Sequence, residues 1–260
     1  MLGIHQHFEY LPSIPNFAKG IQADTFQIFI RNNRNGKRRF ISSDEILEFN
    51  KSIMDAGPST FVVHASYSMN PCTDDMLKRE HYLRMIKEDL HFLRCLAGIK
   101  YYVLHPGSAV TLTHPDAMVN LVNFVNSFKA ELGNTKLAIE IMAGAGTQVV
   151  SSVADVALLY NIFYTEENIG MCLDTCHAFS ADIDFSNIYK TFKNKMFVVH
   201  LNNSMTGKGS YKDRHASVFQ GQIPTEELID FYKQLDNNIP VILETPEYAL
   251  LTDFAMLQEM

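Results

Sequence analysis

Eight short apolar runs, rich in Val, Ile and Leu, recur along this chain of 260 residues and alternate with segments of helical pattern. Continuous apolar runs of this kind predict strands buried on both faces, as in a parallel sheet covered by helices. This alternation constrains the fold more than any other feature, because parallel strands joined by helices form either an open α/β sheet or a closed barrel. The predicted strands are residues 2–5, 25–30, 60–64, 101–105, 136–141, 169–174, 196–201 and 239–244.

Helices are predicted between these strands from capping signals and acidic first turns. Ser43-Asp44-Glu45 and Thr225-Glu226-Glu227 each place a hydroxyl and two carboxylates at a helix start. No linker rich in Gly, Ser or Pro divides the chain. We therefore predict one domain, residues 1–260, folded as a single (β/α)₈ TIM barrel, for which about 250 residues is typical; length alone also allows two smaller domains. The predicted helices are residues 14–20, 43–56, 73–97, 115–132, 151/152–163, 186–192 and 225–235.

Five histidines and four carboxylates stand at the end of a predicted strand or just after it. In a TIM barrel the C-terminal ends of the strands carry the active site. Imidazole and carboxylate are ligands that zinc accepts, and nine such groups exceed the needs of one tetrahedral ion. We therefore predict a cluster of two or three metal ions, with ligands among His64, His105, Glu140, Asp174, His177, His200, Asp213, His215 and Glu244.

Any one of these residues, taken singly, is as compatible with a structural role as with metal binding. Their coincidence at seven strand ends or following loops favours the cluster, since buried unpaired carboxylates and imidazoles are costly. His81, His91 and His114 fall within helical patterns and are expected at the surface or at helix ends. His5 and His7 end the first strand, where a place beside the metals or facing a substrate is the alternative to a structural role.

The formal net charge of −7 argues at first against a nucleic-acid partner. Three bound divalent cations would offset most of that charge, however, and the basic residues are clustered. The clusters fall in the loops after the second and seventh strands, on the face of the proposed ligands, where they can attract phosphate. Solvated loops are the alternative. The basic residues are Arg31, Arg34, Lys37, Arg38 and Arg39 in the first loop, and Lys208, Lys212 and Arg214 in the second.

The chain contains no run of 18 apolar residues, and its first ten residues, MLGIHQHFEY, lack the apolar stretch of a signal peptide. The sequence therefore predicts a soluble intracellular protein that is neither secreted nor bound to a membrane. Its four cysteines are too few for a disulfide framework and are expected to be reduced. Cys172 and Cys176, beside Asp174, are predicted to pack in or near the core.

Several longer segments, spread from residue 26 to residue 246, carry a family resemblance. The segments are FQIFIRNNR, HASYSMN, VLHPGS, LAIEIMAGAGT, IGMCLDTCHAFSA, VVHLNNS, DRHASVFQGQI and IPVILETP. Their most specific parts are LDTCHAF, the HLN stretch and the DRH motif. With these segments the chain resembles the endonuclease IV family of apurinic/apyrimidinic (AP) endonucleases, DNA repair enzymes with a TIM barrel and three zinc ions.

The resemblance implies how the three zinc ions are held. Glu140 would bridge the first two ions, and the third would be bound by residues of the segments after strands six and seven. The implied sets are His64, His105 and Glu140 for the first ion, Glu140, Asp174, His200 and Glu244 for the second, and His177, Asp213 and His215 for the third. The residues implied in catalysis are Glu140, His64, His105, Asp174 and His177.

The resemblance also implies the reaction and the partner. Family members cleave duplex DNA on the 5′ side of an abasic site, leaving a 3′ hydroxyl and a 5′ deoxyribose phosphate, and remove blocked 3′ ends. The chain is expected to act as a monomer. Arg34 matches the loop that enters the DNA, and Tyr67 is the candidate for stacking at the lesion, with core packing as its alternative; Arg38, Lys208 and Arg214 are candidates for phosphate contacts.

Three departures from the family pattern concern neighbours of the proposed ligands. Asn203 replaces a carboxylate, Ala216 replaces a second histidine after the DRH motif, and Ile141-Met142 follow Glu140. We expect these changes to affect the orientation of His200 and Glu140. Two alternatives to the endonuclease remain: a sugar isomerase or epimerase with a single metal, which would leave five of the nine ligands without a role, and a nonenzymatic DNA-binding or scaffold protein.

Overall fold

The computed structural model describes residues 1–55, 57–58 and 60–260. Eight strands, paired in parallel throughout, close into a barrel in the order β1-β10-β7-β6-β5-β4-β3-β2. The predicted barrel is therefore confirmed, and each strand lies within about two residues of its predicted position. The strands are β1 Leu2–Gln6, β2 Thr25–Phe29, β3 Phe61–His64, β4 Ile99–Leu104, β5 Lys136–Glu140, β6 Ile169–Asp174, β7 Met196–His200 and β10 Val241–Leu243.

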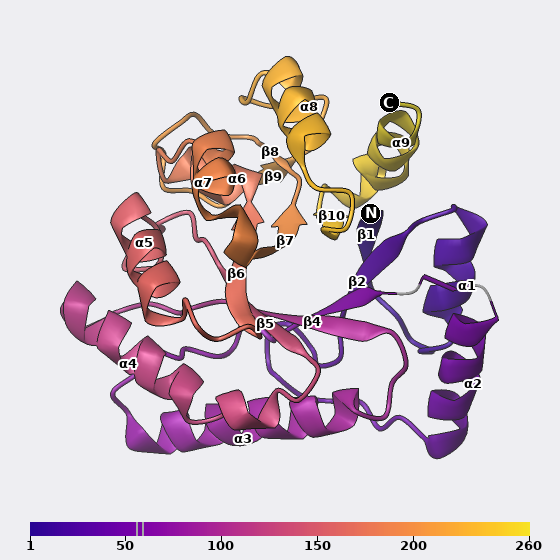
Figure 1. Cartoon of the computed structure of the whole chain (residues 1–260), viewed down its shortest axis with the longest axis horizontal. Helices are drawn as coiled ribbons and strands as arrows, with labels where there is room; N and C mark the ends of the chain where they lie inside the picture. Colours follow the sequence, from indigo (N-terminus) through magenta and orange to yellow (C-terminus); the bar gives the residue numbers. More distant parts are fainter. Residues whose placement is uncertain (56, 59) are drawn as a thin grey trace.

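Helices surround the strands (Figure 1). Side-chain caps begin several of them: Ser42 accepts from the backbone N–H of Glu45, and Asp75 from that of Lys78, so the third helix starts three residues later than predicted. The predicted end of the second helix at residue 56 lies outside the described residues. The helices are α1 Ser13–Gly20, α2 Ser43–Met54, α3 Met76–Leu93, α4 His114–Asn126, α5 Val153–Ile162, α7 Phe185–Phe192, α8 Thr225–Gln234 and α9 Glu247–Gln258.

Two α-helices and one hairpin of the described residues were not predicted. The short helix α6, Thr175–Ser180, directly follows β6 and is buried at every position, so it has no amphipathic pattern. Helix α9 begins after Pro246 without a side-chain cap, as α8 does after Pro224. A small antiparallel hairpin pairs β8, Asn203–Ser204, with β9, His215–Ala216, inside the long connection between β7 and α8.

The barrel interior explains where the proposed ligands lie. Alternate residues of a strand face the same side of a sheet. One compact buried cluster includes Val62, Val103, Ala138, Cys172, Val198 and Ile242. Two residues later on the same strands, or just past their ends, stand His64, His105, Glu140, Asp174, His200 and Glu244. The same inward face is thus apolar in the body of the barrel and polar at its C-terminal rim.

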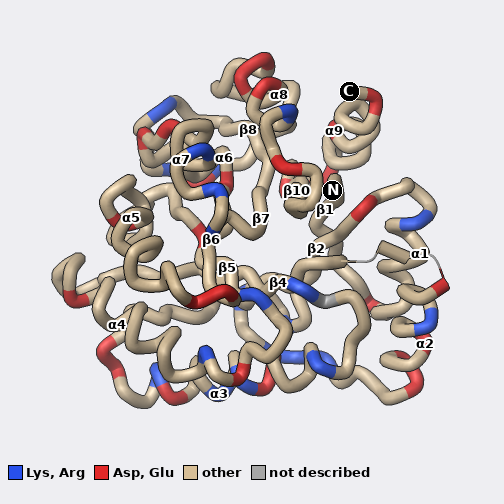
Figure 2. Tube along the Cα trace, viewed as in Figure 1, with Lys and Arg blue, Asp and Glu red and all other residues tan. Residues whose placement is uncertain are grey.

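The larger core cluster packs the outward faces of the strands against the helices. Acidic and basic residues are interspersed along the outer surface of the molecule, for example on α3 (Figure 2). Among the helices of the described residues, none combines the length and the apolar character needed to cross a membrane.

Candidate metal centre

Glu140, at the end of β5, lies at the centre of the cluster and is 1% exposed. Its Oε2 atom is 3.1 Å from His64 Nε2 and 3.0 Å from His105 Nε2. Its Oε1 atom is 3.2 Å from His177 Nδ1 and 3.3 Å from His200 Nδ1. One buried carboxylate therefore faces four imidazole rings, with His64 and His105 at one oxygen and His177 and His200 at the other.

The structure brings the predicted ligands together in three groups, within each of which the donor atoms lie within 4.8 Å of one another. These groups correspond to the three sets that the resemblance implied. Glu244 is not in the second group, but its Oε2 atom lies 3.4 Å from His200 Nδ1. The groups are His64, His105 and Glu140; Glu140, Asp174 and His200; and His177, Asp213 and His215.

The third group depends on the elements that were not predicted. Asp174 caps α6 by accepting from the backbone N–H of His177 at 2.8 Å, which fixes His177 one turn after β6. The β8–β9 hairpin brings Asp213 and His215 back to the same place. Asp213 Oδ2 is 3.3 Å from His177 Nε2, and Asp213 Oδ1 is 3.2 Å from His215 Nε2.

The ring tautomers of three histidines fit metal binding. His64, His177 and His215 each place Nδ1 within 2.7–3.1 Å of a backbone carbonyl oxygen, that of Ala65, Ile141 and Glu244 respectively. An Nδ1–H that donates to a carbonyl leaves a lone pair on Nε2. The Nε2 atoms of His177 and His215 are buried and have no hydrogen-bond partner. Lone pairs directed at carboxylate oxygens repel them unless a cation lies between, so these residues fit a metal site.

The pKa values also indicate that the site favours positive charge. Burial alone would lower the pKa of His215, but Asp174 and Asp213 raise it to about 9. Burial likewise opposes ionisation of Glu140, yet the charges of His105 and His200 hold its pKa well below the usual value. The donor set thus stabilises cations next to ionised carboxylates.

Cysteine is a poorer ligand here than its position suggests. Cys176 also lies within 4.8 Å of donor atoms of Asp174 and His215. Burial raises its pKa to about 11 and that of Cys172 to about 12, so both remain thiols near neutral pH. Both are buried and unpaired, as predicted.

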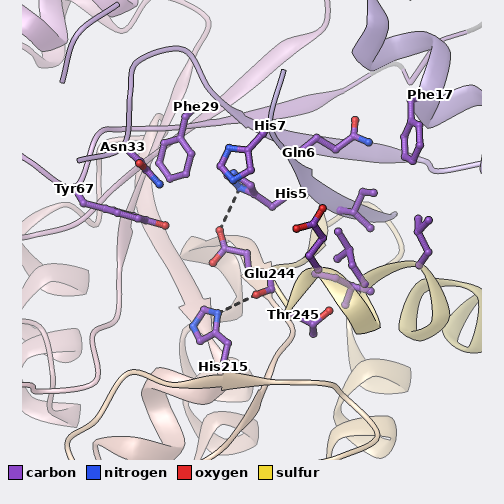
Figure 3. Close-up of a pocket in the computed structure, with 15 residues that line it drawn as sticks. His5, Gln6, His7, Phe17, Phe29, Asn33, Tyr67, His215, Glu244 and Thr245 are labelled. Atoms are coloured by element: carbon purple, nitrogen blue, oxygen red, sulfur yellow. Dashed lines mark hydrogen bonds and ion pairs between the residues drawn. The ribbon is translucent and has the colours of Figure 1, made fainter. Parts of the chain in front are cut away.

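A cavity of about 500 Å³ adjoins the cluster between the ends of β1, β2 and β10 and helices α1 and α9 (Figure 3). Tyr67 lies on one side of it and is 44% exposed. Its ring stacks on His105, with 4.7 Å between centroids, and meets His64 edge-on at 5.2 Å. Tyr67 therefore covers two proposed ligands while one side of its ring stays open. His5, Phe29, His215 and Glu244 also line the cavity.

The comparisons with known proteins agree with this geometry. Residues 15–260 match the family described as a xylose isomerase-like TIM barrel. The probable endonuclease 4 of Mycoplasma genitalium is 35% identical over 82% of this chain and 75% of its own length, and that of Akkermansia muciniphila is 30% identical over 88% and 86%. The chain belongs to the endonuclease IV family.

Solved structures have the same fold. The structure of endonuclease IV from Thermus thermophilus is 27% identical in sequence, and its match covers 100% of this chain and 99% of the Thermus chain with a TM-score of 0.81. A D-tagatose 3-epimerase-like protein, 18% identical with a TM-score of 0.79, shares the fold.

In this endonuclease IV family member, the side chains that orient the ligands are not those expected from the departures. The side chain of Asn203 makes no hydrogen bond to a proposed ligand; its amide instead hydrogen-bonds the backbone of Ser204, Val218 and Ile223 and holds the long connection together. The neighbouring Asn202 donates to Asp174 Oδ2 at 2.7 Å and accepts from the backbone N–H of Glu244 at 2.9 Å. Asn202 therefore ties two proposed ligands together.

The first basic loop is less available to a ligand than the sequence suggested. Arg31 is buried and pairs with Asp89 and Glu88, so its inclusion in a basic rim was wrong. Arg39 pairs with Glu45. Arg38 donates to the carbonyl of Glu88 at 3.3 Å and lies over Phe92.

Arg34 and Lys37 are the exposed members of this loop that have no ion-pair partner among the described residues. In the second loop, Lys208 pairs with Asp182 at 3.5 Å on the surface, and Arg214 donates to the carbonyl oxygen of Asp213. Of the basic residues proposed to contact DNA, Arg34 and Arg214 therefore have no ion-pair partner among the described residues, whereas Arg38 lies 4.0 Å from Asp89 and Lys208 pairs with Asp182.

Proposed function

We propose that this protein is a zinc-dependent AP endonuclease of DNA base-excision repair. It would hydrolyse the phosphodiester on the 5′ side of an abasic site in duplex DNA, leaving a 3′ hydroxyl and a 5′ deoxyribose phosphate, and would also remove blocked 3′ ends. It would act as a monomer inside the cell, where its substrate lies. The observation that carries the proposal is the buried Glu140 carboxylate facing four imidazoles beside a cavity of about 500 Å³.

Zinc is the metal that suits the donor set. Five of the nine proposed ligands are imidazoles, whereas Mg²⁺ prefers carboxylate oxygens and water. Three bound zinc ions would neutralise the phosphate, lower the pKa of the attacking water and stabilise the departing oxygen. The ligands would be the three groups described above, completed by Glu244.

The chain's own side chains prepare the site for a phosphodiester. Glu140 and Asp174 are buried, and Asp174 accepts from Asn202 and from the backbone N–H of His177, so its carboxylate would be oriented for a cation before DNA arrives. Burial and the surrounding carboxylates raise the pKa of Tyr67, which keeps its phenol neutral and avoids repelling a phosphate. The Tyr67 ring also shields His64 and His105 from water.

Recognition of the lesion would come from the rim. An abasic nucleotide has lost its stacking and pairing, so it leaves the duplex at a lower free-energy cost than an intact nucleotide. Arg34 would enter the duplex at the lesion, with Tyr67 stacking beside it. Phosphates would be contacted by Arg38, Lys208 and Arg214 after these side chains leave their present partners in the protein.

A nicking assay on a duplex with one abasic site tests the proposal, with zinc-loaded protein, EDTA-treated protein and EDTA-treated protein resupplied with zinc. We expect cleavage on the 5′ side of the lesion with the first and third samples only. Epimerisation of a ketose by protein that holds one metal per chain, without nicking, would instead support the single-metal sugar epimerase.

A further inference from the structure

Gln27 is a polar residue at the centre of strand β2 and is 0% exposed. Its side-chain amide contacts three groups at the rim of the barrel. The amide nitrogen is 2.5 Å from Glu244 Oε1 and 3.0 Å from His5 Nδ1, and the amide oxygen is 2.9 Å from His200 Nε2. One amide therefore links a proposed metal ligand on β7, another beyond β10 and a histidine of β1.

The carboxylate of Glu244 determines which way this amide points. An amide turned by 180° would bring its oxygen against Glu244 Oε1, and two acceptors in contact in a buried site are strongly unfavourable. The nitrogen therefore faces Glu244, and the oxygen faces His200. His200 must then carry its ring proton on Nε2 and donate it to Gln27.

The consequence for His200 is a free lone pair on Nδ1. This atom lies 3.3 Å from Glu140 Oε1, 3.4 Å from Glu244 Oε2 and 3.9 Å from Asp174 Oδ2. The lone pair thus points to the place where the second zinc is proposed. His64, His177 and His215 obtain the required tautomer from backbone carbonyls, whereas His200 obtains it from a side chain.

The second hydrogen of the same amide sets the tautomer of His5. It is directed to His5 Nδ1 at 3.0 Å, a closer contact than the 3.5 Å between His5 Nδ1 and Glu244 Oε1. An Nδ1 that accepts leaves the ring proton on Nε2. His5 Nε2 is buried, has no partner, and belongs to a residue that lines the cavity in Figure 3. His5 therefore carries a buried Nε2–H that has no acceptor among the described residues.

We propose that Gln27 is a positioning residue that fixes the ring tautomers of His200 and His5, so that His200 presents its Nδ1 lone pair to the metal and His5 keeps its ring proton on Nε2. The inference rests on the metal site of the proposed function. Gln27 fulfils this role because its amide offers one acceptor and two donors on a single rigid plane. Methionine has a similar length but offers neither donor, so Gln27→Met removes all three contacts with little change in volume.

The test uses zinc-loaded wild-type protein, Gln27→Met and the matched control Gln234→Met, which makes the same change on the surface of α8. Competition with a chromophoric chelator measures zinc affinity. Loss of a side chain that orients a metal ligand typically weakens metal binding by about 10- to 100-fold, which is the effect expected for Gln27→Met. Gln234→Met should release zinc as the wild type does.

NMR of protein labelled with ¹⁵N-histidine gives a readout that does not depend on the variant folding. Long-range ¹H–¹⁵N spectra of the wild-type holoprotein should show His200 and His5 protonated on Nε2, with assignments from His200→Gln and His5→Gln. A wild-type spectrum with the ring proton of His200 on Nδ1 overturns the inference. So does a folded Gln27→Met protein that keeps both the wild-type zinc affinity and the wild-type tautomers. Wild-type protein that binds no zinc would instead contradict the proposed metal site.

Discussion

Replacing the buried Arg31 with methionine is expected to destabilise the protein by about 3–5 kcal/mol at pH 8, the usual cost of breaking a buried ion pair. Arg31 is 8% exposed. Its guanidinium donates to Asp89 Oδ1 at 2.6 Å, to Glu88 Oε2 at 2.9 Å and to the carbonyl oxygens of Gly36 and Met85. Methionine would leave Asp89, which is 1% exposed, as a buried carboxylate whose nearest remaining cation is Arg38, with 4.0 Å between Arg38 Nη1 and Asp89 Oδ1.

The destabilisation should shrink as the pH falls. Burial raises the pKa of Asp89 to about 6 in the folded protein, against an ordinary value of 3.8, although Arg31 opposes the rise. A carboxyl group whose pKa is raised on folding favours the folded state below its ordinary pKa, and that contribution is lost as the pH rises through 6. Without Arg31 the pKa of Asp89 rises further. Asp89 is then neutral at pH 5, and its burial lowers the stability of the variant little at that pH.

Urea unfolding at pH 5 and pH 8, followed by circular dichroism, measures both effects. Arg84→Met is the control, because Arg84 makes two exposed contacts, an ion pair with Glu88 at 4.0 Å and a hydrogen bond to His81 Nδ1 at 3.0 Å, and its replacement should cost about 0–1 kcal/mol. Arg31→Met combined with Asp89→Asn should recover much of the lost stability, since asparagine removes the charge and still accepts from the Tyr102 hydroxyl. Equal losses at both pH values, or a loss below about 1 kcal/mol at pH 8, would refute this reasoning.

Three further predictions concern the metal centre and Arg34 in the loop that is proposed to contact DNA. Treatment with excess EDTA should abolish nicking of an abasic duplex, and zinc should restore it better than magnesium; full nicking after prolonged incubation in EDTA would count against the cluster. Glu140→Gln should still bind abasic DNA in a gel-shift assay but cut it about 100-fold more slowly or worse, because the bridging charge is lost; near wild-type turnover would remove Glu140 from the mechanism. Arg34→Ala should keep its zinc and its fold, bind abasic duplex more weakly by about 1–3 kcal/mol, and lose less on a nicked duplex with a blocked 3′ end; unchanged binding at several salt concentrations would make the basic run a solvated turn.

The sequence predicted the barrel and the ligand cluster because both depend on local order along the chain. A ligand two residues beyond an inward-facing apolar residue, as Glu140 is beyond Ala138, must reach the rim whatever surrounds it. The sequence did not predict how His177 and Asp213 approach one another, since this depends on a six-residue helix and a hairpin closed across ten residues. Neither element is long enough to show a periodic pattern of apolar residues from which it could be predicted.

The sequence also did not predict which acidic residues pair with the basic residues. Arg31 resembled its neighbours in the basic run, but its partner Asp89 lies 58 residues away on α3. The apolar pattern of residues 25–30 predicts a buried strand but gives no role to Gln27, although a single amide in a run such as TFQIF is a signal for a buried polar contact. The sequence pointed to Asn203 as the residue that affects the orientation of the ligands, but its neighbour Asn202 makes the contact. The turn after β7 determines which of the two asparagines faces Asp174.

The central claim is that three zinc ions are held at the C-terminal ends of the barrel strands. The most direct measurement is the zinc content of untagged protein, purified from zinc-supplemented cells and dialysed, determined by inductively coupled plasma mass spectrometry. The account predicts about three zinc ions per chain, as the three ligand groups require. One zinc ion per chain, or magnesium in place of zinc, would contradict it.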